Sequence, residues 1–220
     1  LLEPIGRNTA PAIALACLAL DYEEIVLVTP SDHLIKDEKE YEKVLATAKE
    51  LTLQNNLVTF GIKPAFAEVG FGYIEGGEVC SPSTLVSESS ARDVKDFHEK
   101  PDLETAKKYL KAGNFYWNSG IFMFKAGVFL EELKKYSLDI YNTSVEAFNG
   151  ASKGETIRIK HDDMAIIPED SIDYAVMEKS TKVKVVPSDI SWSDLGSFDA
   201  LSEEYDKDEN GNSIDKNLIA

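Results

Sequence analysis

Cysteine and basic residues are scarce in this 220-residue chain, and each scarcity argues against a class of protein. The two cysteines, Cys17 and Cys80, do not make a disulfide framework, and the apolar stretch around Cys17 predicts a buried thiol. Lysine and arginine total 23 against 39 aspartates and glutamates, a net charge of −16. Because a nucleic-acid backbone needs clustered cations, we expect no nucleic-acid partner, whereas a few basic residues suffice for a small anion.

The chain also lacks the patterns of a membrane protein and of two common kinds of catalytic site. No stretch approaches the roughly 18 consecutive apolar residues of a membrane span, and no signal-peptide pattern is present. We therefore expect a cytoplasmic protein without a membrane partner. The three histidines, His33, His98 and His161, lack the spacing of zinc ligands. No Ser-His-Asp or Cys-His arrangement stands out, so the sequence gives no support for covalent catalysis.

Short apolar runs alternate with amphipathic stretches, which predicts a three-layer α/β domain with a mostly parallel sheet. The domain is expected over 1–206 and a polar linker or tail over 207–220. Asp102 should cap one helix and Gly113 should end it. The run at 25–28 suits a parallel strand buried on both faces. The other expected strands span 57–62, 94–98, 121–124 and 182–187, and the other expected helices span 38–53, 126–136, 139–148, 171–180 and 198–205.

Charged side chains follow several of these strands, at the end of the sheet where open α/β proteins bind ligands. Asp32 follows the first strand and Asp194 follows the last, so the two carboxylates can meet over one Mg²⁺. Magnesium prefers one or two carboxylates together with waters and substrate phosphates. The alternative for each aspartate is the cap of a helix N-terminus.

Two further segments carry groups suited to a phosphorylated sugar. Glu99 can accept bonds from hydroxyls and Lys100 can meet a phosphate, although an adjacent Glu-Lys pair is most often a solvated surface pair. Asn118, in the segment WNSGIF, can both donate and accept, next to a glycine that permits close approach. The alternative for this segment is a turn before a strand.

Seven segments in order resemble the mannose-1-phosphate guanylyltransferases, or GDP-mannose pyrophosphorylases, of the bacterial type that is sometimes fused to a phosphomannose isomerase. The likeness extends from Glu3 to about Asn212. It implies the nucleotide-diphospho-sugar transferase fold, a Rossmann-like three-layer architecture with a mostly parallel, mixed sheet. The segments are EPIGRNTAPAIALA, VTPSDHLI, GFGYIE, FHEKPD, WNSGIFMF, SIDYAVMEKS and ISWSDLGSFDAL.

The resemblance implies an activity: transfer of GMP from GTP to mannose 1-phosphate, giving GDP-mannose and pyrophosphate with Mg²⁺. It implies that Asp32 and Asp194 hold the metal, and that these two aspartates and Lys100 are the catalytic residues. Arg7 is expected to hold its loop through backbone carbonyls rather than to touch substrate. The remaining implied roles are guanine binding by Glu3 and Asn8, contact with mannose by Gly72 and Tyr73, and bonds to its hydroxyls from Glu99 and Asn118.

The chain departs from the family at its start, where a strand and a Gly-rich GxGxR loop are expected and nothing matches them. We therefore expect a chain that begins inside the family's sequence and is weak or inactive alone. We also expect the strand at 25–28 to have an open edge that favours self-association, including a homodimer. Two alternatives remain: a catalytically silent fragment that keeps sugar-phosphate binding or an assembly role, and a related transferase for another sugar 1-phosphate or nucleotide.

Overall fold

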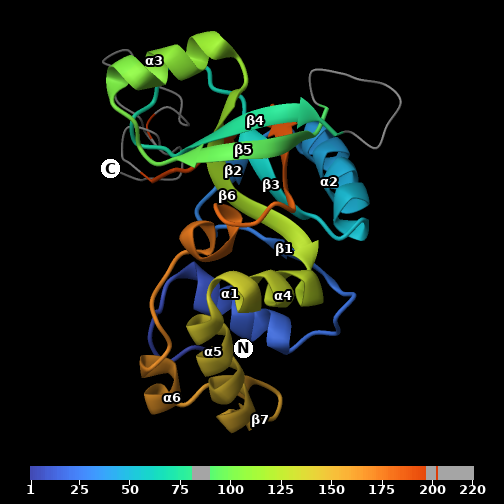
Figure 1. Ribbon diagram of the computed structural model, residues 1–220, viewed down its shortest axis with the longest axis vertical. Coiled ribbons are helices and arrows are strands. Elements are labelled where there is room, and N and C mark those ends of the chain that lie inside the picture. Colours follow the sequence, from blue (N-terminus) through green and yellow to red (C-terminus); the bar gives the residue numbers. More distant parts are fainter. Residues whose placement is uncertain (81–89, 197–201, 203–220) are drawn as a thin grey trace, which may run out of the picture.

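The computed structural model describes residues 1–80, 90–196 and 202 (Figure 1). The expected helix at 198–205 and the expected tail at 207–220 therefore lie outside the described residues. The helices are α1 (Thr9–Leu18), α2 (Glu38–Leu53), α3 (Leu103–Ala112), α4 (Ala126–Tyr136), α5 (Leu138–Gly150), α6 (His161–Ala165) and a π-helical turn, η1 (Asp173–Met177). The strands are β1 (Ile25–Val28), β2 (Leu34–Ile35), β3 (Leu57–Ile62), β4 (Tyr73–Val79), β5 (Arg92–His98), β6 (Phe115–Lys125), β7 (Ser152–Lys153), β8 (Ile157–Arg158), β9 (Val183–Ser188) and β10 (Trp192–Ser193).

Six strands form one mixed sheet in the order β1-β6-β3-β9-β5-β4, in which β6 also pairs with β4. The α/β class and the mixed sheet are confirmed, but the expectation of a mostly parallel sheet is wrong. Among the described strands of this sheet, only β3 and β9 pair in parallel. The sheet is mostly antiparallel because β6, which is longer than the 121–124 run, pairs antiparallel with β1, β3 and β4.

Strand β1 differs from its expected environment. It pairs antiparallel with β6 and lies at the edge of the sheet, so it is neither parallel nor buried on both faces. Leu27 is 40% exposed. The expected open edge is present, because β6 is the only partner of β1 among the described strands.

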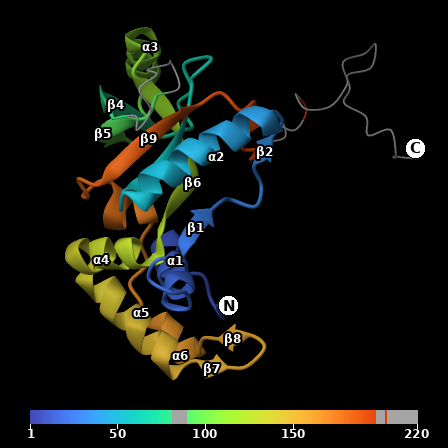
Figure 2. The ribbon, with the colours of Figure 1, turned by 90° about the vertical axis from the view of Figure 1, so that its right-hand side faces the viewer.

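Helices cover both faces of the sheet, so the three-layer prediction is confirmed (Figure 2). On one face, α2 packs Val44, Ala48 and Leu51 against alternate residues of β3, including Val58 and Phe60. The other face packs against α1, α4, α5 and η1 through Leu57, Phe122, Phe124 and Val183. Because neighbouring residues of β3 and β6 point to opposite faces, both strands are almost entirely buried.

Local capping chemistry fixes the helix that follows β5. The Asp102 carboxylate accepts a bond from the backbone N–H of Thr105 at 2.7 Å, and Gly113 ends α3 with a φ of 76°. Both expectations for this helix are confirmed. The Cys17 thiol is buried, as expected, and burial raises its pKa to about 12. Within the described ranges, no helix combines the length and the apolar character needed to cross a bilayer.

Candidate functional site

The two aspartates proposed for a metal lie on loops that are joined by a two-stranded ribbon. β2 begins two residues after Asp32, and β10 ends one residue before Asp194. The ribbon is antiparallel, with Trp192 opposite Ile35 and Ser193 opposite Leu34. The same segments are joined further by the N–H groups of residues 36 and 37, which donate to the carbonyls of residues 191 and 190. The fold therefore brings together two loops that are about 160 residues apart in the sequence.

A side-chain hydrogen bond reinforces this ribbon. Trp192 Nε1 donates to His33 Nδ1 at 3.1 Å, and the two rings meet edge to face with centroids 5.1 Å apart. Burial lowers the pKa of His33, while the negative charges of Asp32 and Asp194 oppose that shift. Both carboxylates are therefore close enough to act electrostatically on one imidazole.

The backbone on both sides of β10 is strained. Ser191 and Leu195 have φ values of 51° and 46°, in the left-handed region that residues with a Cβ rarely adopt. Between them, the Asp194 carboxylate accepts a bond from the Gly196 N–H at 3.2 Å. Such strain persists only where neighbouring contacts hold the chain in place, and it clusters at functional sites.

Four of the residues assigned to sugar binding line a single small pocket at the end of β4, β5 and β6. They are Gly72, Tyr73, Glu99 and Asn118. The Asn118 N–H donates to the Gly72 carbonyl at 2.8 Å, which joins two of the segments directly. Asn118 lies within β6, so the alternative of a turn before a strand does not hold.

Gly72 leaves room for the Glu99 carboxylate. A Cβ there would lie 3.3 Å from the Glu99 Oε2, which is tight, and 3.7 Å from the Asn118 Cβ, which is ordinary van der Waals contact. A side chain at this position would therefore displace the Glu99 carboxylate by a few tenths of an ångström. Gly72 thus keeps the mouth of the pocket open between Glu99 and Asn118.

Tyr73 lines this pocket but does not offer its hydroxyl to it. The side chain is fully buried, and its hydroxyl donates to the Glu68 carbonyl at 2.8 Å and accepts from the Glu68 N–H at 3.1 Å. The ring packs against Tyr109 with centroids 5.3 Å apart. Tyr73 therefore supports the pocket wall, and the loop that contains Glu68, rather than supplying a polar contact.

Two carboxylates of the pocket, Asp173 and Glu178, were missed by the sequence reasoning. Asp173 Oδ1 accepts a bond from Asn118 Nδ2 at 2.9 Å. Burial raises the pKa of Asp173, the Asn118 bond lowers it, and the Glu99 charge raises it. Desolvation and the charges of Asp173 and Glu99 likewise raise the pKa of Glu178. The pattern of apolar residues in SIDYAVMEKS predicts a helix over 171–180, and it does not reveal that Asp173 bonds to Asn118 of β6 or that Glu178 lines the pocket.

Lys100 stands beside the pocket rather than in its lining. Its Nζ lies 3.5 Å from the Glu99 Oε1, and its side chain is 63% exposed. The Lys100 backbone has a φ of 33°, a further strained position next to a candidate residue. The ammonium is therefore free to swing toward a ligand that occupies the pocket.

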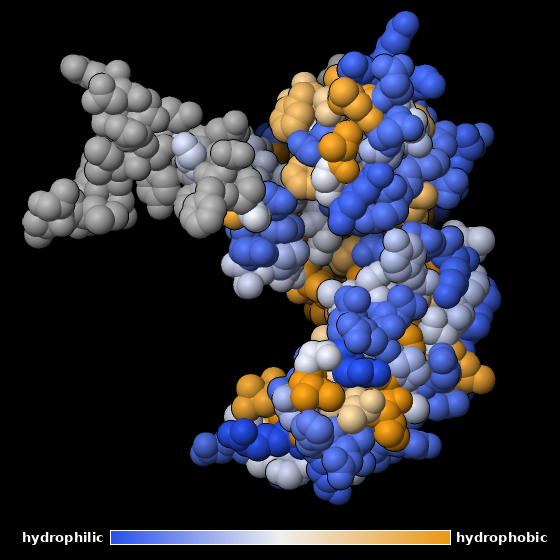
Figure 3. Space-filling model, turned by 90° about the vertical axis from the view of Figure 1, so that its left-hand side faces the viewer, coloured by the Kyte–Doolittle hydropathy of each residue, from blue (hydrophilic) through white to orange (hydrophobic). Residues whose placement is uncertain are grey.

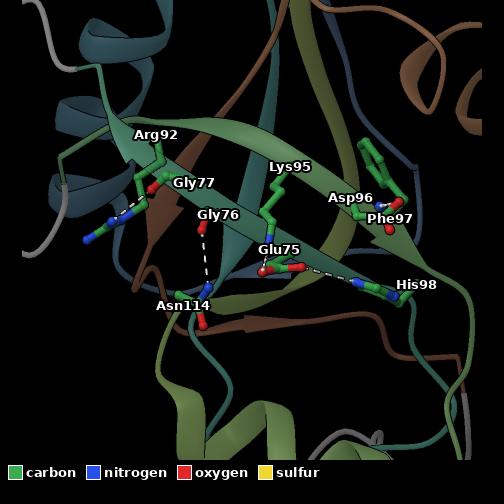
Figure 4. Close-up of polar contacts among 9 residues, drawn as sticks. All are labelled: Glu75, Gly76, Gly77, Arg92, Lys95, Asp96, Phe97, His98 and Asn114. Atoms are coloured by element: carbon green, nitrogen blue, oxygen red, sulfur yellow. Dashed lines mark hydrogen bonds and ion pairs between the residues drawn. The ribbon is translucent and has the colours of Figure 1, made fainter.

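Polar contacts between β4 and β5 brace the strands that carry the pocket (Figure 4). The Glu75 carboxylate meets Lys95 Nζ at 2.6 Å and lies 3.7 Å from His98 Nε2. Farther along the strands, Arg92 donates to the Gly77 carbonyl at 3.1 Å. The backbone pairing of β4 with β5, which places Tyr73 opposite His98, fixes the start of the loop that presents Glu99, and the Glu75–Lys95 and Arg92–Gly77 contacts join the same two strands.

The segment before α1 is held at the other end of the molecule. Leu2 pairs with β8, and Arg7 Nε donates to the Ile167 carbonyl at 2.7 Å, so the expected role of Arg7 in holding the loop is confirmed. The Asn8 side chain accepts a bond from the Thr9 N–H at 2.7 Å and caps α1, with a φ of 68°. Glu3 lies exposed on this segment.

A hollow separates the two ends of the molecule (Figure 3). The ribbon views place β2 at its upper edge and the N-terminal segment with β7 and β8 at its lower edge, with β1 behind it (Figure 2). The N-terminal segment, which carries Glu3 and Asn8, thus lies at a different edge of the hollow from β2, which follows Asp32. Ligands that reach both edges would have to span the hollow.

A small pocket and two aspartate-bearing loops beyond the strands of a mixed α/β sheet are typical of α/β proteins that handle charged small molecules. The chain belongs to the nucleotidyl transferase family, whose model matches residues 1–211. It is 46% identical to a mannose-1-phosphate guanylyltransferase of Salmonella montevideo over 214 residues, 96% of this chain and 45% of that protein. It is 44% identical to the alginate biosynthesis protein AlgA of Pseudomonas putida, over 96% of this chain and 44% of that protein.

A solved structure extends these similarities to three dimensions. The structure of a protein named mannose-6-phosphate isomerase from Helicobacter pylori is 41% identical and matches with a TM-score of 0.76, over 87% of this chain and 72% of that one. The chain spans about half the length of the curated relatives it matches.

Proposed function

We propose that this protein transfers GMP from GTP to mannose 1-phosphate, giving GDP-mannose and pyrophosphate. The names of the curated relatives support this substrate pair, and the relatives are similar over nearly the whole chain. The name AlgA also supports a product used for polysaccharide synthesis. Because GTP is a cytoplasmic nucleotide, we place the reaction in the cytoplasm.

The observation that carries the proposal is the convergence of Gly72, Glu99 and Asn118 on one pocket. In the proposed complex, the Glu99 carboxylate accepts bonds from mannose hydroxyls. Asn118 uses one N–H on Asp173, so its second N–H and one lone pair of its oxygen remain for the sugar. Lys100 meets the sugar phosphate from the side of the pocket. Glu3 and Asn8 are proposed to bind guanine from the opposite side of the hollow.

A divalent metal ion is used generally in this family, and we propose Mg²⁺ held by Asp32 and Asp194. In the described part of the chain, no cluster of three or more His, Cys, Asp or Glu side chains is arranged as a metal site. Two carboxylates nevertheless fit Mg²⁺, which takes its other ligands from water and substrate phosphates. When bound, the ion would supply neutralisation of phosphate charge in a chain whose net charge is −16.

The protein's own residues then position two polyanions. An oxygen of the sugar phosphate forms a bond to the α-phosphorus of GTP in line, while the bond from that phosphorus to the departing pyrophosphate oxygen breaks. The attacking phosphate is already an anion near neutral pH, so no side chain needs to remove a proton. Positioning by Glu99 and Asn118 and charge neutralisation by Lys100 are the contributions we assign to the described residues.

An assay of GDP-mannose formation tests the proposal. A protein that carries this chain together with the GxGxR loop of the family is incubated with Mg²⁺, mannose 1-phosphate and, in parallel, GTP, UTP, ATP or dTTP. We expect product from GTP alone, and a product from another nucleotide would instead support the related transferase. No product from any nucleotide, in a protein that still binds GDP-mannose, would support the silent fragment. Mannose 6-phosphate is included because of the name of the Helicobacter pylori protein, and its conversion to a ketose without any formation of GDP-mannose would overturn the proposal.

A further inference from the structure

In the hydrogen bond between Trp192 and His33, only one of the two residues can be the donor. An indole Nε1–H can only donate, so His33 Nδ1 must be the acceptor and the imidazole proton must be on Nε2. The bond joins side chains 159 residues apart. Each lies within two residues of one aspartate of the proposed metal pair, since His33 follows Asp32 and Trp192 precedes Asp194 by two positions.

The indole is held in place from its other side. Phe71 packs edge to face on Trp192 with centroids 5.4 Å apart, and it contacts Trp117 in the same way, also at 5.4 Å. Phe71 precedes Gly72, and Trp117 precedes Asn118, so both rings belong to segments that line the sugar pocket. A continuous set of aromatic rings thus runs from the pocket wall to the imidazole beside Asp32.

We propose that His33 and Trp192 are a positioning pair, whose hydrogen bond holds the Asp32 and Asp194 loops at the separation that one divalent cation needs. The inference rests on the metal assignment made in the proposed function. The ribbon pairs only Leu34 with Ser193 and Ile35 with Trp192, so its strand pairing ends before the two aspartates. The bond from Trp192 to His33, which adjoins Asp32, ties the two loops together beyond the strand pairing, as hydrogen bonds that orient metal ligands do.

Histidine NMR and Mn²⁺ binding test the pair directly. With only three histidines in the chain, ¹⁵N-labelled imidazoles give few signals. We expect His33 in the neutral Nε2–H form, and we expect Mn²⁺ added alone to broaden His33 before His98 and His161. Free Mn²⁺ measured by electron paramagnetic resonance should show about tenfold weaker binding in Trp192→Phe, a loss of metal affinity typical of changes to residues that orient metal ligands.

Matched variants separate the hydrogen bond from the ring. Tyr22→Phe is the control, because Tyr22 is 48% exposed and the change likewise removes a polar group while keeping an aromatic ring, so its Mn²⁺ affinity should be unchanged. His33→Asn keeps an acceptor near the Nδ1 position and should stay within about twofold of the parent chain, whereas His33→Phe should weaken Mn²⁺ about tenfold. Unshifted His98 and His161 signals in Trp192→Phe would report an intact fold.

Failure of the positioning pair and failure of the metal assignment give different results. Equal Mn²⁺ affinity in Trp192→Phe and the parent chain, or a His33 proton on Nδ1, would overturn the positioning pair and leave the metal assignment intact. Mn²⁺ that never reaches His33 in the parent chain would overturn the metal assignment itself, and the positioning pair with it.

Discussion

Asn118 on β6 donates a hydrogen bond from Nδ2 to the Asp173 carboxylate on η1 at 2.9 Å. The Asn118 oxygen also accepts from the Gly120 N–H at 3.3 Å, so both ends of the amide are oriented. This pairing joins the sheet to the π-helical turn at the floor of the pocket. In the proposed complex, the sugar therefore lies against an amide whose orientation is already fixed, which reduces the entropy lost on binding.

Asp173→Ala should weaken GDP-mannose binding about tenfold and destabilise the fold by about 1–3 kcal/mol, because it leaves the Asn118 amide without its partner. Calorimetry and urea unfolding measure the two effects. Asp162→Ala is the control, since the Asp162 side chain is fully exposed, and it should change stability by less than about 0.5 kcal/mol. Equal behaviour of the two variants would contradict the role of Asp173.

Asp173 also predicts a pH dependence of stability. Burial raises its pKa in the folded chain above the ordinary value of 3.8, so the folded state binds its proton more tightly than the unfolded state does. This contribution to stability is complete below the unfolded pKa and is lost as pH rises through the folded pKa. Asp173→Asn resembles the protonated form and should gain stability relative to the parent chain as pH rises from about 4 to about 8. A constant difference across this range, in urea unfolding, would contradict the assignment.

Asp194→Asn should abolish the Mg²⁺ dependence of GDP-mannose binding without unfolding the chain, because the amide keeps the shape and loses the charge that a hard cation needs. Asp189→Asn is a matched control, since Asp189 is exposed just before the same ribbon. Its binding should keep the parent Mg²⁺ dependence. Unchanged Mg²⁺ dependence in Asp194→Asn would remove this residue from the metal site.

The free edge of β1 predicts self-association of the isolated chain. Leu27 is 40% exposed on this strand, and an unpaired apolar edge favours pairing with a second copy. Light scattering should show dimers or larger species that Leu27→Lys reduces. Leu53→Lys replaces a leucine that is 55% exposed at the end of α2 and should not reduce them. A monomeric parent chain at high concentration would contradict the prediction.

Local chemistry explains which elements could be predicted from the sequence. The bounds of α2 follow from its 3.6-residue apolar pattern and from the Asp37 carboxylate, which accepts a bond from the Glu40 N–H. The α3 helix follows in the same way from Asp102 and Gly113. The grouping of Glu99 with Asn118 came only from the resemblance, since 18 intervening residues say nothing of distance.

What could not be predicted depends on contacts between distant segments. The direction of β6 is set by its pairing with three other strands, and periodicity carries no information on direction. The Trp192 bond to His33 and the Asn118 bond to Asp173 likewise join separate motifs. The exposure of Leu27 follows from the edge position of β1, which an apolar run alone does not reveal.

Calorimetric titration of this chain with GDP-mannose, with and without Mg²⁺, tests the central claim most directly. The account predicts binding that Mg²⁺ strengthens and that Asn118→Ala weakens, with circular dichroism showing a folded chain in each case. The absence of GDP-mannose binding by a folded chain, or equal binding by Asn118→Ala, would contradict the claim that this pocket holds the sugar of a nucleotide-linked mannose.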